Sequence, residues 1–236
     1  MIKKRIYQLR KKFKDYEIDG YIIPKNDEFF SEYAQKDRLK TISNFTGSAG
    51  FAVVLKKKCY LFVDGRYTIQ AEIEAGKNFK IINYGKIINC KLFKNLTIGI
   101  DPKLFTSQQI SKFFFENNKI KEIESNLIDK ICNKYKIYSR PFFSLGKNIV
   151  GETHQSKIKK VVKIMREKRS KYLFISAPEN VAWLLNIRGY DNPSSPIPNC
   201  RLLISNQKKI FFISEKNKVK NLIKEKKVKK RNLIDP

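Results

Sequence analysis

The stretch from Ser43 to Glu72, SNFTGSAGFAVVLKKKCYLFVDGRYTIQAE, carries the clearest structural pattern in this chain of 236 residues. Two short apolar runs, Phe51–Leu55 and Cys59–Val63, are separated by three consecutive lysines, which is typical of a β-hairpin. A glycine then interrupts the pattern, and helical spacing follows from Tyr67 to Ala75. The stretch therefore predicts two paired strands followed by a helix.

The alternation of strands and helices extends to both sides of this stretch. Helical spacing of apolar residues predicts an amphipathic helix over Ile2–Phe13, and a short apolar run predicts a buried strand over Tyr21–Ile23. Further strands are predicted at Phe79–Ile82 and Thr97–Ile100, and further helices at Ser107–Glu116 and Asn126–Tyr135. Such alternation indicates an α/β fold, a sheet with helices on its faces.

The periodicity lapses between Ser139 and Gly151, where proline and glycine punctuate the chain, and then restarts. The second half predicts a helix over Lys157–Lys168, a strand over Tyr172–Ile175, a helix beginning at Pro178, a hairpin of Arg201–Ile204 with Ile210–Ile213, and a helix over Lys216–Lys226. This order repeats that of the first half. The sequence therefore predicts two related α/β domains, 1–140 and 151–236, and leaves open whether the second is truncated at its C-terminal end.

The segment FTGSAG precedes the first strand of the hairpin and is the first candidate site. Gly47 and Gly50 permit positive φ and close approach of the backbone, and Ser48 can hydrogen-bond within the turn. Glycine-rich loops without a full phosphate-binding pattern are weak functional signals. We therefore interpret Gly47, Ser48 and Gly50 as a structural turn.

Asp64, Gly65 and Arg66 lie where the second strand of the hairpin ends and a helix begins. A carboxylate at this position can cap the helix, so Asp64 and Gly65 are predicted to be structural. Arg66 is different, because a guanidinium at a strand end can bind a carboxylate through two hydrogen bonds. Arg66 is therefore a candidate for a substrate-binding cleft.

The segment from Asn186 to Pro198 is a loop that contains one glycine and three prolines. Proline restricts the backbone, so a loop of this composition can present side chains at fixed positions. Its charged residues, Arg188 and Asp191, leave two interpretations open. They form an internal ion pair that only shapes the loop, or they face a substrate-binding cleft.

The formal net charge of +28 suggests binding to polyanions. Only ten of the 50 basic residues are arginine, however, and the lysine runs overlie helical apolar spacing, which is typical of solvated helix faces. A basic surface without the sequence motif of a nucleic-acid-binding fold is weak evidence for nucleic-acid recognition. We therefore expect nonspecific adhesion to polyanions at low salt and no specific nucleic-acid partner.

No catalytic or metal-binding residue can be assigned from the sequence. The single histidine, His154, has no Asp or Glu cluster at ligand spacing around it. The four cysteines, Cys59, Cys90, Cys132 and Cys200, are too far apart for a compact disulfide framework or a paired-cysteine zinc site. The motifs G-x-S-x-G, H-E-x-x-H and the Walker-type phosphate loop are also absent from the sequence.

The sequence contains no apolar run long enough to cross a membrane, and its N-terminus lacks the apolar region of a signal peptide. We therefore expect a cytoplasmic protein without a membrane partner.

Two segments together resemble the N-terminal and middle domains of Xaa-Pro aminopeptidases, members of the creatinase/prolidase superfamily. They are Ser43–Glu72, with its GSAG turn and DGRY step, and Glu179–Ile204, ENVAWLLNIRGYDNPSSPIPNCRLLI, with its N-x-R-G-x-D-x-x-x-x-P loop. The SEY of Ser31–Tyr33 and the G-x-T-x-x-x-K beginning at Gly151 agree as well. The resemblance implies two tandem creatinase/prolidase N-terminal-like domains, each a mixed β-sheet flanked by helices.

The resemblance also implies where the chemistry of such an enzyme resides. In this family a third, pita-bread domain holds two divalent metals, manganese or zinc, through two Asp, one His and two Glu, and the metals activate water to attack the Xaa-Pro bond. That domain is absent from this sequence, which we expect to be inactive alone and to bind no cofactor. The family further implies a homodimer, and short proline-containing peptides as substrates of the full-length enzyme.

The leading hypothesis is therefore the non-catalytic N-terminal part of a metal-dependent Xaa-Pro aminopeptidase, contributing dimerisation and control of access to the active site. The first alternative is a freestanding binding or scaffold module without peptidase activity. The second alternative is a lysine-rich polyanion-binding protein.

Overall fold

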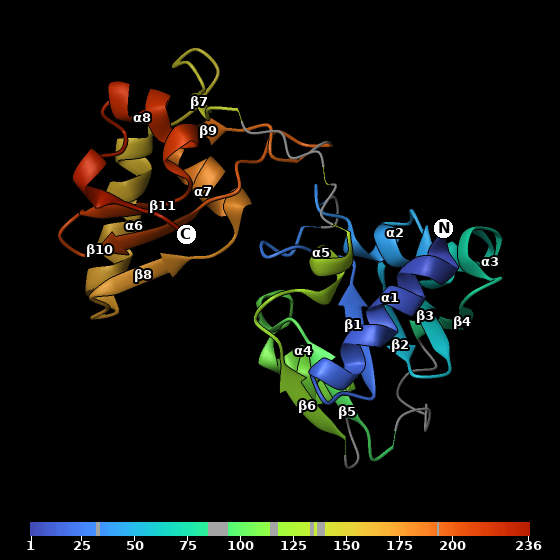
Figure 1. The fold of residues 1–236 in the computed structure, drawn as a ribbon. Helices are drawn as coiled ribbons and strands as arrows, with labels where there is room; N and C mark the ends of the chain where they lie inside the picture. Colours follow the sequence, from blue (N-terminus) through green and yellow to red (C-terminus); the bar gives the residue numbers. More distant parts are fainter. Residues whose placement is uncertain (32–33, 85–93, 114–117, 133–134, 136–139, 193) are drawn as a thin grey trace. The chain divides into compact units, whose positions relative to one another are not determined.

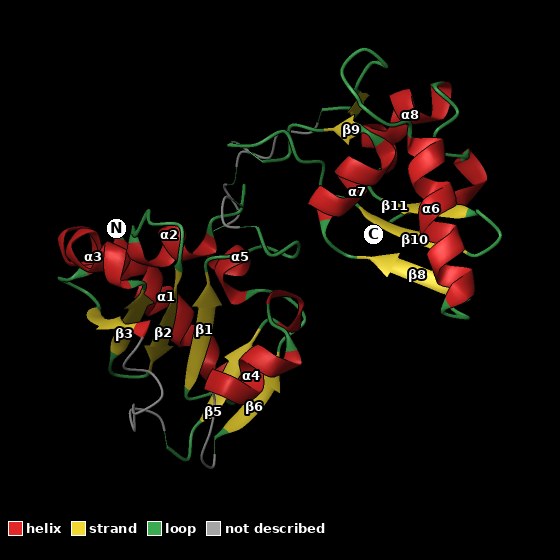
Figure 2. Cartoon of the chain, turned by 180° about the vertical axis from the view of Figure 1, so that it is seen from behind, coloured by secondary structure: helices red, strands yellow, loops and turns green. Residues whose placement is uncertain are grey.

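The structure is a computed structural model that describes residues 1–31, 34–84, 94–113, 118–132, 135, 140–192 and 194–236. Contacts divide the chain into two compact units, Met1–Tyr135 and Lys136–Pro236, called unit 1 and unit 2 below. Each unit has its own sheet and its own helices (Figure 1 and Figure 2). Several residues named above lie outside the described ranges: Glu32, Tyr33, Cys90, Glu116, Ser139 and Pro193.

Unit 1 is built on a six-stranded sheet in the order β4-β3-β2-β1-β5-β6. Of these strands, β2 runs antiparallel to both neighbours, and the other five are parallel to one another, so the sheet is mixed. The strands are β1 Gly20–Pro24, β2 Gly50–Leu55, β3 Cys59–Val63, β4 Lys80–Asn83, β5 Thr97–Ile100 and β6 Lys119–Glu122. The predicted hairpin is confirmed as β2 and β3.

Helices cover both faces of this sheet, because successive strand side chains point to opposite sides. Tyr21 and Ile23 belong to the core formed with α1, α2, α3 and α5, whereas Ile22 belongs to the core on the other face, against which Ile110 of α4 packs. The helices are α1 Ile2–Asp15, α2 Arg38–Ser43, α3 Thr68–Ala75, α4 Ser107–Phe113 and α5 Leu127–Ile131, with 3₁₀ turns η1 Gly65–Tyr67 and η3 Pro102–Leu104. The predicted α/β class is confirmed.

Two elements of unit 1 were not predicted from the sequence. Strand β6 reads KIKE, and its alternating charges suit an exposed sheet edge but give little apolar signal. Helix α2 has six residues, too few to show a helical period, although Asp37 caps it by accepting a hydrogen bond from the Lys40 amide. Both elements depend on tertiary packing rather than on local pattern.

Unit 2 has a smaller mixed sheet in the order β12-β11-β10-β8, with β12 parallel to β11 and the other pairs antiparallel. Ile158 of α6, Leu184 of α7 and Leu222 of α8 share one core with Leu202 and Phe212 of the sheet. The elements are β7 Phe143–Ser144, α6 His154–Glu167, β8 Tyr172–Ile175, α7 Pro178–Leu185, β9 Ile187–Arg188, β10 Arg201–Ser205, β11 Ile210–Ile213, η4 Lys216–Val219, α8 Lys220–Lys224, η5 Lys230–Asn232 and β12 Leu233–Ile234.

Unit 2 differs from the predicted pattern in several places, among them strand β12, which was not predicted. The helix predicted over Lys216–Lys226 is divided into a 3₁₀ turn, η4, and the short helix α8. The residues between the predicted domains are part of unit 2, because Phe142 is buried in its core and β7 pairs with β9. A two-residue strand is too short to give a period in the sequence.

Candidate functional site

The parallel strands of unit 1 end at one edge of the sheet, called the strand-end edge below (Figure 1). β1 ends there at Pro24, β3 at Val63 and β5 at Ile100, and the antiparallel β2 begins there at Gly50. In open α/β sheets, ligands bind outside the carboxyl ends of parallel strands. The glycine turn and the Asp64–Arg66 step therefore lie at the edge of the unit that is most suited to binding.

The glycine turn that leads into β2 is a site of close packing. A Cβ on Gly47 would lie 2.3 Å from Cζ of Phe45, and a Cβ on Gly50 would lie 2.9 Å from the carbonyl oxygen of Phe62. Neither glycine has positive φ, so of the two reasons considered for glycine here, close approach of neighbouring atoms is the one that applies. Ser48 Oγ lies 2.9 Å from the Tyr67 hydroxyl, which connects the turn to the residue before α3.

Asp64 lies at the N-cap of η1, where its carboxylate accepts a hydrogen bond of 3.0 Å from the Arg66 amide. The Arg66 Nε donates to the same carboxylate at 2.9 Å, and this hydrogen bond lowers the pKa of Asp64 below its ordinary value. The Arg66 guanidinium also lies 5.3 Å from the centre of the Tyr67 ring. The Arg66 guanidinium remains exposed. To bind the carboxylate of a ligand through the same donors, it would have to break its ion pair with Asp64.

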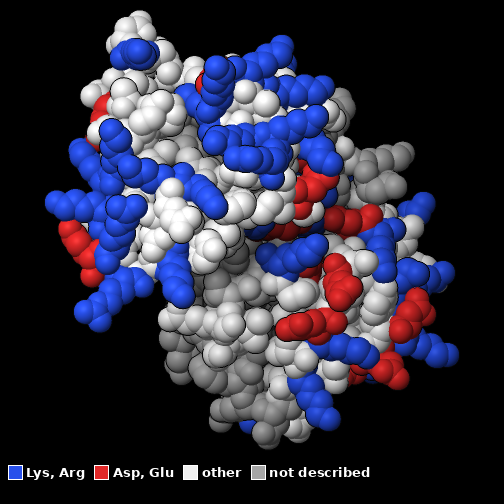
Figure 3. Space-filling view, turned by 90° about the vertical axis from the view of Figure 1, so that its left-hand side faces the viewer, with Lys and Arg blue, Asp and Glu red and all other residues white. Residues whose placement is uncertain are grey.

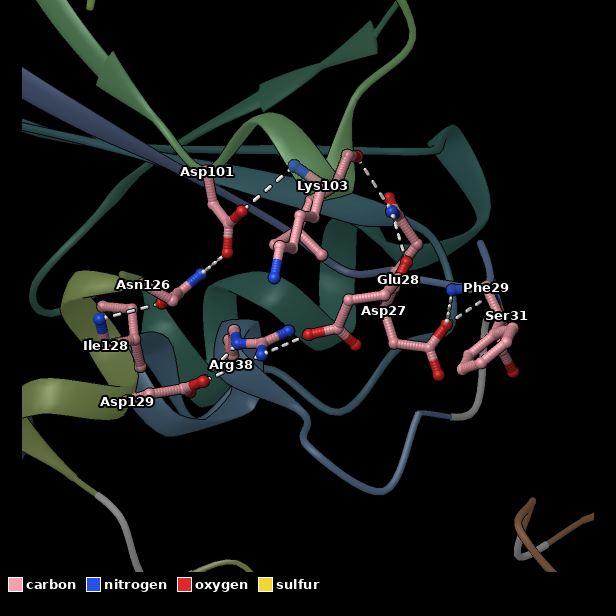
Figure 4. Close-up of polar contacts among 12 residues, drawn as sticks. Asp27, Glu28, Phe29, Ser31, Arg38, Asp101, Lys103, Asn126, Ile128 and Asp129 are labelled. Carbon is pink, nitrogen blue, oxygen red and sulfur yellow. Dashed lines mark hydrogen bonds and ion pairs between the residues drawn. The ribbon is translucent and has the colours of Figure 1, made fainter. Parts of the chain in front are cut away.

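A buried arginine beside the strand-end edge was missed by sequence reasoning. Arg38 is 2% exposed, and its Nε and Nη2 donate to Asp129 at 2.9 and 2.8 Å, while Nη2 also donates to Glu28 at 2.7 Å (Figure 4). These three residues, the Arg38 network, join the loop after β1 to α2 and α5. A signal did exist, because Arg38 is one of only ten arginines among 50 basic residues, and arginine, unlike lysine, offers a planar fork of donors.

The charges of the Arg38 network stabilise one another. Burial by itself would raise the pKa of Glu28, but the charge and hydrogen bond of Arg38 outweigh burial and leave this pKa below its ordinary value. Burial likewise opposes the charge of Arg38, and the hydrogen bonds that Arg38 donates to Asp129 and Glu28, together with their negative charges, raise the pKa of Arg38 despite it. The contact between Glu28 and Arg38 therefore favours the charged form of both groups.

The loop between β1 and α2 is organised by a second carboxylate. Asp27 accepts hydrogen bonds from the amides of Phe29 and Ser31 at 2.9 and 3.0 Å (Figure 4). Burial raises the pKa of Asp27 in spite of these bonds. Next to this loop, Asp101 follows β5 and accepts from the Asn126 side chain at 2.9 Å. These contacts fix the shape of the loops at the strand-end edge.

The structure places Asp191 inside unit 2, with only 3% of the residue exposed. Its Oδ2 accepts a hydrogen bond of 2.7 Å from the Asn199 amide, and its Oδ1 lies 3.0 Å from Nζ of Lys218, which is equally buried. Burial raises the pKa of Asp191, although the Asn199 bond and the Lys218 charge oppose the shift. The ion pair of Asp191 is thus with Lys218, and not with Arg188 as one interpretation expected.

Arg188 lies in β9, half-buried, with its Nη1 2.8 Å from the carbonyl of Ile187 and 3.4 Å from that of Ala182. The following loop is held tightly, because a Cβ on Gly189 would lie 2.8 Å from Cα of Pro198, and the Gly189 amide donates to Pro196. Within unit 2 the structure therefore does not join Arg188 and Asp191 in an ion pair, and Arg66 belongs to unit 1.

The described residues do not provide a metal site. No group of three or more His, Cys, Asp or Glu side chains among them could hold a metal ion. His154 lies in a lysine-lined pocket of unit 2, and burial together with the charge of Lys227 lowers the pKa of its imidazole. Among all the residues that the structure describes, no helix is long and apolar enough to cross a membrane.

Two family profiles, both described as the creatinase/prolidase N-terminal domain, match residues 5–130 and 133–234. The chain belongs to the creatinase/prolidase N-terminal domain family. The two profiles together cover nearly the whole sequence, and each coincides with one sheet and its helices. The fold consists of two tandem creatinase/prolidase N-terminal domains, as the resemblance implied.

Curated relatives of this creatinase/prolidase chain are Xaa-Pro aminopeptidases. A probable Xaa-Pro aminopeptidase P of Laccaria bicolor is 32% identical over 230 residues, which is 89% of this chain and 35% of the relative. Xaa-Pro aminopeptidase 1 of Dictyostelium discoideum is 31% identical, over 91% of this chain and 38% of the relative. The chain thus spans about a third of the length of these relatives and matches their N-terminal part.

Among solved structures, the X-prolyl aminopeptidase of Caenorhabditis elegans matches all of this chain and 42% of its own, with a TM-score of 0.83 and 22% identity. At this identity the match shows the fold. That protein is described as a cytosolic enzyme with a di-nuclear active site. The creatinase/prolidase fold of both units is therefore found together in one solved enzyme.

Proposed function

We propose that this chain is the non-catalytic, N-terminal part of a metal-dependent Xaa-Pro aminopeptidase, an enzyme that removes the residue preceding proline from a peptide. The observation that carries the proposal is similarity over about nine-tenths of the chain to relatives with that name, of which the chain spans about a third. The described residues do not fit a metal site. The two divalent metals of such an enzyme, manganese or zinc, would accordingly be held elsewhere in the full-length protein.

We further propose that the two units support catalysis by dimerisation, by restricting access to the active site and by orienting short proline-containing peptides. Arg66 and Arg188 are the side chains proposed to face such a cleft, because both guanidinium groups are at least partly exposed. Asp191 would act indirectly, since it is buried and holds the loop after Arg188 through Asn199 and Lys218. The cytosolic description of the C. elegans enzyme supports a cytoplasmic location.

The purified 236-residue chain, supplied with manganese or zinc, is expected not to hydrolyse Xaa-Pro peptides above background. The physical reason is that its described residues do not offer the ligands needed to hold a metal-activated water. Release of the N-terminal amino acid from a fluorogenic Xaa-Pro peptide measures this, with a known aminopeptidase as positive control. Turnover that a chelator abolishes and metal restores would contradict the assignment.

In the full-length protein, Arg188→Ala is expected to lower kcat/KM roughly tenfold, equivalent to about 1.4 kcal/mol of transition-state stabilisation. The reason is that a half-buried guanidinium held by the Ile187 carbonyl can present its remaining donors to a carboxylate or peptide carbonyl. Steady-state kinetics and thermal unfolding are measured on the same preparations. Lys168→Ala, which removes an exposed cation of the same unit, is the control.

The alternative outcome for Arg188 is equally clear. Unchanged kcat/KM with a lower melting temperature would make Arg188 a structural residue and remove it from the proposed cleft. If Arg66→Ala gives the same result, the strand-end edge takes no part in substrate binding.

The principal alternative is a freestanding binding or scaffold module derived from such an enzyme. The genomic sequence downstream of codon 236 discriminates between the two. A continuing open frame that encodes two Asp, one His and two Glu at the family's ligand positions supports the peptidase assignment. A stop codon followed by an unrelated gene supports the scaffold module.

A further inference from the structure

Unit 2 contains a pocket of about 740 Å³, called the lysine pocket below. It lies beside the first turns of α6, the turn between β10 and β11, and the segment that follows α8. Its lining residues are His154, Gln155, Ile158, Lys159, Gln207, Lys208, Lys209, Ile210, Phe211, Lys226, Lys227, Lys229, Arg231 and Asn232. A volume of this size is sufficient for a drug-sized or nucleotide-sized ligand.

The lysine pocket is strongly cationic. Seven of its fourteen lining residues are Lys or Arg, and none is Asp or Glu. Among the described residues, none of these seven forms an ion pair, whereas the neighbouring Lys160 pairs with Glu152. Figure 3 shows one face of the molecule, and in the upper part of this view Lys and Arg side chains are more frequent than Asp and Glu side chains. Like charges brought together without counter-charge raise the energy of the empty pocket.

Burial disfavours the charged form of two groups in the pocket, Lys227 and His154. Burial lowers the pKa of Lys227, whose Nζ donates to the carbonyls of Leu185 and Asn186, although the nearby charge of Glu225 opposes the shift. Burial and Lys227 together lower the pKa of His154. An anion in the pocket would reverse both effects, because it stabilises the charged form of each group.

The remaining lining is neutral and includes both polar and apolar side chains. Gln155, Gln207 and Asn232 carry amide groups, and Ile158, Ile210 and Phe211 supply apolar surface. Phe211 is the aromatic residue of the lining, so the pocket lacks the successive stacking platforms of a site for single-stranded nucleic acid. Concentrated lysines in a concave site of limited volume favour a compact multivalent anion.

We propose that the lysine pocket binds a small polyphosphate anion, either inorganic or carried by a nucleotide. Lysine ammonium groups are strongly hydrated point charges that suit phosphate oxygens, and several are needed to neutralise a chain of phosphates. This activity is separate from the proposed peptidase function, because Arg66, Arg188 and Asp191 do not line the pocket.

The single histidine provides a selective probe for this site. Ring signals of His154 in two-dimensional NMR are unambiguous, because the sequence contains no other histidine. Titration with tripolyphosphate at about 150 mM salt is expected to shift these signals saturably and to raise the pKa of His154. Sulfate at the same ionic strength is the control for simple screening. Absence of a saturable shift at His154 overturns the proposal.

Matched variants separate the pocket from the general basic surface. The triple variant Lys209→Gln, Lys229→Gln and Arg231→Gln is expected to weaken tripolyphosphate binding at least tenfold. The control variant Lys147→Gln, Lys168→Gln and Lys220→Gln removes the same charge from exposed positions of unit 2 outside the pocket, and it is expected to bind like the parent. Equal weakening in both variants would show diffuse attraction to the surface and overturn the proposal.

The source of the phosphates is distinguished by comparing ligands. If ATP binds more tightly than tripolyphosphate, the apolar side of the pocket contacts the nucleotide base. If the two bind equally, the site recognises the phosphate chain alone. Both results support the proposal. A single-stranded oligonucleotide that binds more tightly than tripolyphosphate, with the same loss in the pocket variant, would replace the proposal with nucleic-acid binding. Peptidase activity of the full-length protein is expected to be unaffected by the pocket variant.

Discussion

Replacing Arg38 by methionine is expected to lower the free energy of unfolding by about 3 kcal/mol. Methionine has similar length but no charge, so Glu28 and Asp129 lose the cation that both of them face. Loss of one partner from a buried ion pair costs about 3–5 kcal/mol. We expect a loss at the lower end of this range, because the side chains of Glu28 and Asp129 are 31% and 29% exposed and water can partly solvate them.

Urea unfolding followed by circular dichroism measures this loss, and two further variants define its origin. Arg38→Lys keeps the charge without the planar fork, so an intermediate loss is expected. Arg66→Met removes an exposed arginine from its local pair with Asp64, and its expected effect is below about 1 kcal/mol. A loss for Arg38→Met no larger than that for Arg66→Met would show that the Arg38 network does not stabilise unit 1.

Replacing Lys218 by methionine is expected to cost about 3 kcal/mol or more at neutral pH, because Asp191 would remain buried without its cation. Both side chains are nearly inaccessible, so water cannot take the place of the ammonium group. Adding Asp191→Asn to the variant removes the stranded charge and keeps an oxygen that can accept from the Asn199 amide. The double variant is therefore expected to be more stable than Lys218→Met alone.

The same variant is expected to depend on pH in a defined direction. Burial raises the pKa of Asp191 in the folded state above its pKa in the unfolded state. This shift stabilises the folded state at pH values below the unfolded-state pKa, and the stabilisation is lost as the pH rises through the folded-state pKa. The deficit of Lys218→Met should therefore be smaller at about pH 4 than at pH 7, because the carboxyl group is then protonated. A deficit that is independent of pH would show that packing, and not the charge of Asp191, causes the loss.

Much of the fold could be predicted from the sequence because its main elements carry strong local patterns. The strands β2 and β3 are continuous apolar runs separated by three lysines, and the helices α1 and α6 have apolar residues at helical spacing. Strand β6 carries no such pattern, since half of its residues are lysine. Its place in the sheet is decided by its parallel pairing with β5, which no local window contains.

The side-chain partners could not be predicted, because they come from distant parts of the chain. Arg38 and Asp129 are 91 positions apart, and they meet because α2 and α5 pack on the same face of the sheet. Asp191 was considered as a partner of Arg188, its neighbour in sequence, whereas its actual cation lies in η4. Proximity in sequence suggests an ion pair between two charged residues, but tertiary packing determines which charged side chains are buried in contact with one another.

The mixed sheet of unit 1 has a consequence for synthesis of the chain. β1 pairs with β2, which follows it closely, but its other neighbour is β5, and Asp19 and Thr97 at that junction are 78 positions apart. Short loops close at lower entropic cost than long ones, so the antiparallel pairs can form first. A ribosome-bound chain that has not yet been extended past Thr97 therefore exposes one unpaired edge of β1, where another strand can add.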